Sequence, residues 1–155
     1  MIDWAGPDVP GVIGVDHVAI AVDDLEAAVT LHTDALGLTV VHREANAEQG
    51  VLEVMLRTAA GIGPGTQLQL VAALDEHSPV HRFLDRRGPG LHHLAYAVHD
   101  VSSASEVLLR RGLRLLYDAP RAGTRGSLIN FVHPKDTGGV LIELVESAAQ
   151  TQGQG

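Results

Sequence analysis

Two histidines stand at equivalent places in a repeated stretch of the sequence. The segment HVAIAVDD begins at His17, and HLAYAVHD begins at His93, 76 residues later. A second match follows, because TQLQLV contains Gln69 and VLIELV contains Glu143, 74 residues apart. Self-similarity at a long and nearly constant spacing is typical of duplicated structural units. We therefore expect two related modules, each of which brings one histidine and one further polar residue to a shared centre.

These four residues are candidate metal ligands. Side chains alternate between the two faces of a strand, so His17 shares its face with Ala19 and Ala21, whose small side chains leave room for a cleft. Glu143 stands between aliphatic residues, where an uncompensated carboxylate is costly to bury. A hydrogen-bonded structural role is the alternative for each residue taken alone. The matched positions favour a divalent cation, and two imidazoles, an amide and a carboxylate suit Co²⁺, Mn²⁺, Fe²⁺, Ni²⁺ or Zn²⁺.

Glu53 is the candidate general base. In GVLEVML, Leu52 and Val54 face the core, so Glu53 lies on the opposite, cleft-facing side. A carboxylate there that is not needed as a ligand could take up a proton, although a solvent-facing glutamate on an ordinary strand is the alternative. Asn130 stands at roughly the equivalent place in the second repeat. It could bind a substrate oxygen or complete the hydrogen bonding of a strand edge.

Three basic residues lie in loops of the second repeat, namely Arg121, Arg125 and Lys135. They could form a small basic rim that binds the phosphates of a ligand. The alternative is that they are ordinary solvated charges. We treat them as candidate substrate-binding residues.

The elements that would position these residues follow the same order twice. Alternating and helical patterns predict strand, helix and three strands in each half, which is a βαβββ module. Asp23 or Asp24 begins the first helix and Gly37 ends it, while Asp100 or Ser102 begins the helix of the second half. The expected strands are 15–22, 38–43, 51–57, 66–73, 91–99, 113–117, 127–132 and 140–146, and the expected helices are 25–36, 80–87 and 101–111.

The fold expected from this order is α+β, with two modules in one single domain. Module one covers about 13–74, a linker about 75–90 and module two about 91–147, and the polar tail over 148–155 is expected to be disordered. The AAGIGPG segment reads as a hairpin connection between the third and fourth strands. We expect both sets of strands to join in a cupped, eight-stranded mixed sheet.

Composition narrows the class of protein. The 155 residues include 45% hydrophobic residues, which can form a core, and the formal net charge of −8 argues against nucleic-acid or anionic-membrane partners. The absence of cysteine excludes disulfides and thiolate chemistry. No apolar run reaches the ~18 residues of a membrane span, and no secretory signal is visible, so a cytoplasmic protein is expected.

The chain resembles the vicinal oxygen chelate superfamily and, within it, the methylmalonyl-CoA epimerase family. The motifs that carry the resemblance span most of Val15–Glu146 and are VDHVAIAVDDLEAA, HREANAEQGVLEVML, TQLQLVAAL, GLHHLAYAV, RGLRLLYDAPRAGT and INFVHPKDTGGVLIELVE. The sequence departs from the family at His32, where tyrosine is frequent, and at Ala97, where arginine is frequent. Both departures bear on the acyl pocket.

The resemblance implies an isomerase that interconverts (R)- and (S)-methylmalonyl-CoA, or a close 2-substituted malonyl-CoA. It implies metal ligation by His17, Gln69, His93 and Glu143, with Co²⁺ as the first choice. It also implies proton transfer by Glu53 and Glu143 through a metal-stabilised enolate. The partner is then an acyl-CoA substrate, and a homodimer is expected.

Two other functions stay open at this point. His17, His93 and Glu143 alone would suit a non-haem iron extradiol dioxygenase, against which Gln69 and Glu53 argue. The same scaffold could also serve a metal-free small-molecule-binding protein. Oxygen uptake with a catechol would indicate the first alternative, and tight binding without metal the second.

Overall fold

The structure, a computed structural model, describes residues 10–58 and 65–151. In these ranges the chain divides into two compact units, one formed by residues 16–93 and the other by residues 10–15 and 94–151. The lead-in over residues 1–9, most of the AAGIGPG connection and the last four residues of the tail lie outside the described ranges. The module boundaries expected from the sequence stay predictions.

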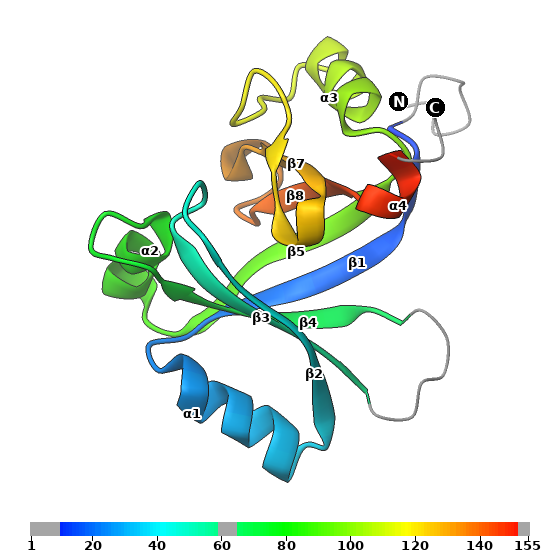
Figure 1. Ribbon diagram of the computed structural model, residues 1–155. Helices are drawn as coiled ribbons and strands as arrows, with labels where there is room; N and C mark the ends of the chain where they lie inside the picture. The colour runs from blue at the N-terminus through cyan, green and yellow to red at the C-terminus, as the bar shows by residue number, and fades with distance from the viewer. Residues whose placement is uncertain (1–9, 59–64, 152–155) are drawn as a thin grey trace. The chain divides into compact units, whose positions relative to one another are not determined.

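Eight strands form one mixed sheet in the order β2-β3-β4-β1-β5-β8-β7-β6 (Figure 1). The pairs β1–β4 and β5–β8 are parallel, while β2–β3, β3–β4, β6–β7 and β7–β8 are antiparallel. The expected α+β class with an eight-stranded mixed sheet is thereby confirmed. The strands are β1 (Val12–Ala21), β2 (Leu38–Asn46), β3 (Val51–Thr58), β4 (Gln67–Ala73), β5 (Gly90–Val98), β6 (Arg121–Ala122), β7 (Leu128–Val132) and β8 (Ile142–Glu146).

The helices begin at residues that suit their positions. Asp24 accepts a hydrogen bond from the Ala27 amide, and Asp100 accepts one from the Ser103 amide, so aspartates cap both principal helices. Gly37 has a φ of 72°, which a glycine adopts without strain at a helix end. The helices are α1 (Leu25–Thr30), η1 (Leu31–Ala35), α2 (Pro79–Arg87), α3 (Val101–Arg110), η2 (Thr124–Gly126), η3 (Pro134–Asp136) and α4 (Ala148–Thr151).

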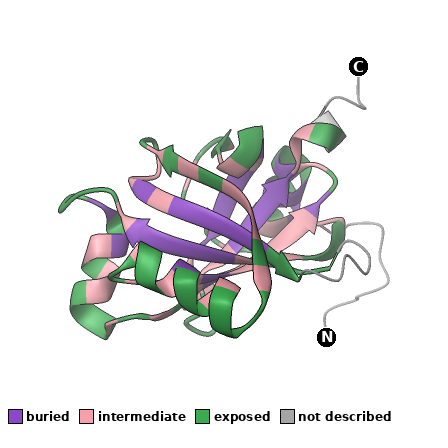
Figure 2. Cartoon of the chain, turned by 60° about the horizontal axis from the view of Figure 1, so that its bottom comes forward, coloured by how far each residue is buried: buried purple, intermediate pink, exposed green. Residues whose placement is uncertain are grey.

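Burial is concentrated on the strands (Figure 2). In the unit of residues 16–93, Val29 of α1 packs on Val54, Leu56 and Leu70, which come from β3 and β4. In the other unit, Val101 and Ala104 of α3 pack on Val98, Val132 and Leu144. In each unit the helix thus covers the sheet face that carries the larger aliphatic side chains, and the side chains of opposite parity belong to the other face.

The first helix differs from the expectation in its second half. A π-helical segment, η1, continues α1, and the Leu36 amide donates to the Leu31 carbonyl five residues earlier. The wider turn shifts the following side chains around the axis, and Leu36, expected on the apolar face, is 60% exposed. The strict 3.6-residue period therefore fails for this last turn.

The strand expected over Leu113–Tyr117 is wrong as a continuous strand. Only an isolated bridge between Leu115 and Val132 remains there, and the sixth strand is the short β6 further along the chain. The reason is the Asn130 side chain, whose Oδ1 accepts from the Tyr117 amide and whose Nδ2 donates to the Tyr117 carbonyl. A side chain thus replaces the neighbouring strand at Tyr117, and Pro120 has no amide hydrogen with which to continue the ladder.

The end of the chain is partly ordered. The sequence predicts a disordered tail from residue 148, whereas α4 occupies Ala148–Thr151. Alanine is the strongest helix former, which accounts for this short helix. Among the described residues, no helix combines the length and the apolar character needed to cross a bilayer.

Candidate active site

His17 and His93 meet inside the unit of residues 16–93. Their side chains come from β1 and β5, the two residues are only 3% and 8% exposed, and their Nε2 atoms lie 3.1 Å apart. His17 Nδ1 lies 2.7 Å from Asp16 Oδ2. Because an ionised carboxylate only accepts hydrogen bonds, Nδ1 of His17 is the donor, and the Nε2 atom of a neutral ring then presents its lone pair.

This pair fits a divalent cation. Two imidazole nitrogens bound to one ion at about 2.1 Å, at a right angle, lie about 3 Å apart, close to the observed distance. The Asp16–His17 contact is the carboxylate–imidazole arrangement that orients metal-binding histidines. His93 Nδ1 lies 2.8 Å from His92 Nδ1, so a proton donated from His93 to His92 leaves His93 Nε2 with its lone pair as well.

The two supporting residues, Asp16 and His92, are not among the residues predicted from the sequence. Strict alternation turns the His92 side chain away from His93, and Asp16 lies outside the repeated positions. Each stands directly before a candidate ligand in the sequence. A carboxylate or second imidazole next to a ligand histidine is therefore the signal that could have found them.

Gln69 and Glu53 form the second pair in this unit. Gln69 Nε2 donates to Glu53 Oε2 at 2.7 Å, and the two residues are 3% and 4% exposed. The registers Ala19–Gln69 and Met55–Gln69 place them on the same sheet face as His17. The amide nitrogen is directed to Glu53, so the carbonyl oxygen is the Gln69 atom that could ligate a cation.

Glu143 lies in the other unit, on β8. Its strand partners are Ala95 on β5 and Phe131 on β7, so its carboxylate belongs to a face otherwise formed by Ala95, Ile129, Phe131 and Val145. By residue type and burial, His17, His93 and Glu143 are a candidate set of metal ligands. The chemistry of the whole donor set, two imidazoles, an amide oxygen and a carboxylate, suits a divalent ion without thiolate preference.

Asn130 belongs to the opposite face of its sheet. The approximate pairing of Asn130 with Glu53 is wrong by one residue, because Ile129 pairs with Val145 as Glu53 pairs with Val71. Asn130 is 1% exposed, and its described hydrogen bonds all go to protein atoms, including the Phe131 amide. These contacts agree with the strand-edge role, and its substrate-binding role stays a prediction that the register does not favour.

The three basic candidates lie on exposed parts of the unit that contains Glu143. The guanidinium of Arg121 lies 3.9 Å from the centre of the Tyr117 ring, which holds it over an aromatic face. Arg125 has a φ of 58°, a left-handed conformation that is uncommon outside glycine. The substrate-binding roles of all three, Lys135 included, stay predictions.

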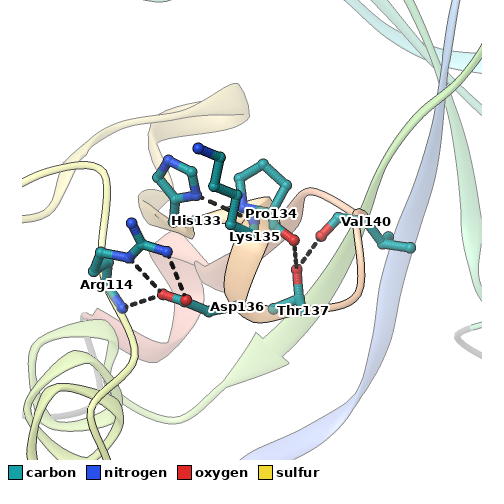
Figure 3. A network of polar contacts seen from close by, with 7 residues as sticks. All are labelled: Arg114, His133, Pro134, Lys135, Asp136, Thr137 and Val140. Atoms are coloured by element: carbon teal, nitrogen blue, oxygen red, sulfur yellow. Dashed lines mark hydrogen bonds and ion pairs between the residues drawn. The ribbon is translucent and has the colours of Figure 1, made fainter.

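Lys135 stands in a well-ordered turn (Figure 3). Its amide donates to His133 Nδ1, while its ammonium group points away from Asp136. Arg114 donates two side-chain hydrogen bonds to Asp136, at 2.8 and 3.0 Å, and these hold the pKa of the Asp136 carboxyl well below its usual range. The exposed ion pair fixes the turn and leaves Lys135 at the surface.

Comparison with known proteins agrees with this geometry. A profile of the Glyoxalase/Bleomycin resistance protein/Dioxygenase superfamily matches residues 16–131. An ethylmalonyl-CoA/methylmalonyl-CoA epimerase of Cereibacter sphaeroides is 36% identical, over 84% of this chain and 95% of that protein.

Solved structures extend the likeness over nearly the whole chain. Methylmalonyl-CoA epimerase from Mycobacterium tuberculosis is 45% identical with a TM-score of 0.86, over 99% of this chain and 97% of that chain. A variant of the Streptomyces coelicolor methylmalonyl-CoA epimerase, in complex with 2-nitronate-propionyl-CoA, is 42% identical with a TM-score of 0.84, over 89% and 99%.

The relatives are epimerases, which are isomerases, as the sequence resemblance implied. The profile match covers most of the chain, and the identities exceed 30% over more than four fifths of it. The chain therefore belongs to the Glyoxalase/Bleomycin resistance protein/Dioxygenase superfamily, in the family of that superfamily that contains the methylmalonyl-CoA epimerases.

Proposed function

We propose that this protein interconverts the two C2 epimers of methylmalonyl-CoA, or of a close 2-substituted malonyl-CoA. One observation carries the proposal: a buried carboxylate, Glu53, lies on the same sheet face as the His17–His93 pair and is held by Gln69. Such a carboxylate can take a proton from a carbon acid bound beside the histidines. The named activities of the Cereibacter, Mycobacterium and Streptomyces relatives supply the substrate class.

A divalent cation would be held by His17, Gln69, His93 and Glu143. When bound, it would supply positive charge to the substrate oxygens that become more negative as the C2 proton leaves. The short Nε2–Nε2 distance and the carboxylate behind His17 support this part of the proposal. Co²⁺ is our first choice, ahead of Mn²⁺, Ni²⁺, Fe²⁺ and Zn²⁺.

Two carboxylates would share the proton transfer. Glu53 would remove the C2 proton on one side, and Glu143 would return a proton on the other, with the roles exchanged in the reverse direction. The hydrogen bond from Gln69 orients Glu53 before substrate binds. The apolar neighbours of Glu143 favour its protonated form, as a proton donor requires.

The remaining parts of the proposal concern the rest of the substrate and the assembly. Arg121, Arg125 and Lys135 would attract the phosphates of coenzyme A, and Arg121 is the best placed of them because Tyr117 supports its guanidinium. The Asn130 contact with substrate, the homodimer and the cytoplasmic location are carried over from the sequence as predictions.

The decisive test is exchange of the C2 hydrogen of methylmalonyl-CoA in deuterated water, with and without a chelator. We expect exchange and epimerisation by the purified protein, loss of both after chelation, and recovery on adding Co²⁺. Oxygen consumption with a catechol in place of exchange would favour a dioxygenase. Tight thioester binding without exchange, unaffected by His93→Ala, would indicate a binding protein.

A further inference from the structure

A second polar pair lies beside Glu53, at the edge of the same sheet. His42 Nε2 lies 2.5 Å from Glu44 Oε2, and both belong to β2, the edge strand next to β3. In the β2–β3 register, Glu44 is the direct partner of Glu53. Directly opposed residues of antiparallel strands have their Cβ atoms about 5 Å apart on one face. Glu44 is therefore the nearest cross-strand neighbour of the proposed base.

A β-bulge brings this pair to the catalytic face. Val40 belongs to the face covered by α1, and strict alternation would place His42 and Glu44 on that face too. The register shifts between Val40 and His42, which inserts one residue and reverses the parity of the residues after the bulge. Arg43 confirms the reversal, because it reaches Glu26 of α1 at 2.6 Å.

The proposed reaction needs a proton route at this place. After one turnover with two bases, Glu53 holds the proton that it removed, and it must lose that proton before it can act again in the same direction. Glu53 is only 4% exposed, whereas the Glu44 side chain is 26% exposed. The row from Glu53 to Glu44 thus connects a buried carboxyl group with water at a sheet edge.

We propose that Glu44 carries protons between Glu53 and solvent, and that His42 holds Glu44 in position. This inference rests on the proposed function. The carboxyl group of Glu53 gives its proton to the Glu44 carboxylate, directly or through one water, and Glu44 releases it to bulk water; uptake follows the same path in reverse. No other bond changes and no electrons are transferred. The Nε2–H of His42 donates to Glu44 and keeps it turned toward Glu53.

The test separates this role from a structural one through steady-state kinetics. Proton return takes place on the free enzyme, between turnovers, so slowing it lowers kcat and KM together and leaves kcat/KM unchanged. In Glu44→Gln we expect kcat for methylmalonyl-CoA epimerisation to fall roughly tenfold or more, the order of a lost proton-transfer group. His42→Gln should show the same pattern with a smaller fall.

Two further measurements make the result decisive. Small buffer acids such as imidazolium should restore kcat in Glu44→Gln, since they can carry the proton instead. Glu26→Gln and Arg43→Gln, which break the ion pair on the other face of β2, are matched controls and should retain wild-type kinetics.

Each outcome decides the inference. An unchanged kcat in Glu44→Gln, or an equal fall in kcat and kcat/KM without buffer rescue, overturns the relay and leaves the epimerase standing. A wild-type protein that does not epimerise the thioester overturns the proposed function, and the relay with it.

Discussion

The two repeats carry different chemistry on faces of the same parity. In the unit of residues 16–93, the face that holds His17 also carries the hydrogen-bonded pair Gln69–Glu53. In the other unit, the face that holds Glu143 is otherwise apolar, and Ile129 stands where register places the counterpart of Glu53. Duplication has thus kept polar residues on the first and fourth strands of both repeats, but a third-strand carboxylate in only one.

This difference indicates how a duplicated fold separates two tasks. Ligation needs residues from both repeats around one ion, so matched positions on the central strands are useful twice. A base acts on one side of a carbon atom, so one carboxylate on one third strand is sufficient. The second repeat uses the equivalent region for packing, as Ile129 contacts Phe131 and Val145 in its apolar cluster.

The largest effect should come from removing the one third-strand carboxylate. Glu53→Gln retains the shape of the side chain but cannot accept the C2 proton, and we expect epimerisation to fall roughly 10²- to 10⁴-fold. Cation content, measured by elemental analysis, should remain unchanged because Gln69 and the histidines are intact. Ile129→Val, the matched change in the second repeat, should leave the rate nearly at the wild-type value. Wild-type activity in Glu53→Gln would show that the repeats do not differ in this way.

The next effect concerns the support behind His17. Asp16→Asn should weaken cation affinity roughly 10- to 100-fold, because it removes the carboxylate that fixes the ring and raises its basicity. Calorimetric titration of metal-free protein with Co²⁺ measures this directly. Asp23→Asn, at an exposed position after the same strand, is the control. Equal affinities for the two variants would mean that Asp16 serves only the surface.

Much of this arrangement could be predicted because burial alternates so regularly along these strands. His17, Gln69, His93 and Glu143 all fall on the expected parity, and Asp24 and Asp100 begin helices as their side chains allow. A single period of two per strand is enough to identify them.

The failures occur where the backbone leaves that period. The bulge before His42 turns two polar residues to the catalytic face, although alternation assigns them to the α1 face. The π-helical turn exposes Leu36. The predicted alignment of Asn130 is wrong by one residue, because no local pattern reports which residue of β7 faces β8. Bulges and registers depend on partner strands, which are distant in sequence.

Asn130 gives the third prediction, which tests whether the second repeat uses this position for structure. In Asn130→Ala the amide and carbonyl of Tyr117 lose their partner, and we expect unfolding free energy to fall by about 2 kcal/mol. Urea denaturation measures it, with Ser105→Ala as a milder control, since its contact with Asn130 is long at 3.4 Å. A several-fold rise in KM at unchanged stability would instead establish Asn130 as a substrate-binding residue.

The smallest effect should come from Glu146, a buried carboxyl at the end of β8. Burial, and secondarily the charge of Asp100, raises its pKa above the ordinary value of 4.5. Because the folded state holds this proton more tightly than the unfolded state, Glu146 favours folding most below pH 4.5. That contribution is lost as pH rises through the folded-state pKa. Glu146→Gln remains neutral, so its stability relative to wild type should increase as pH rises from 4 to 7. Thermal unfolding at several pH values measures the difference, and a constant difference over that range would show that burial does not disfavour this charge.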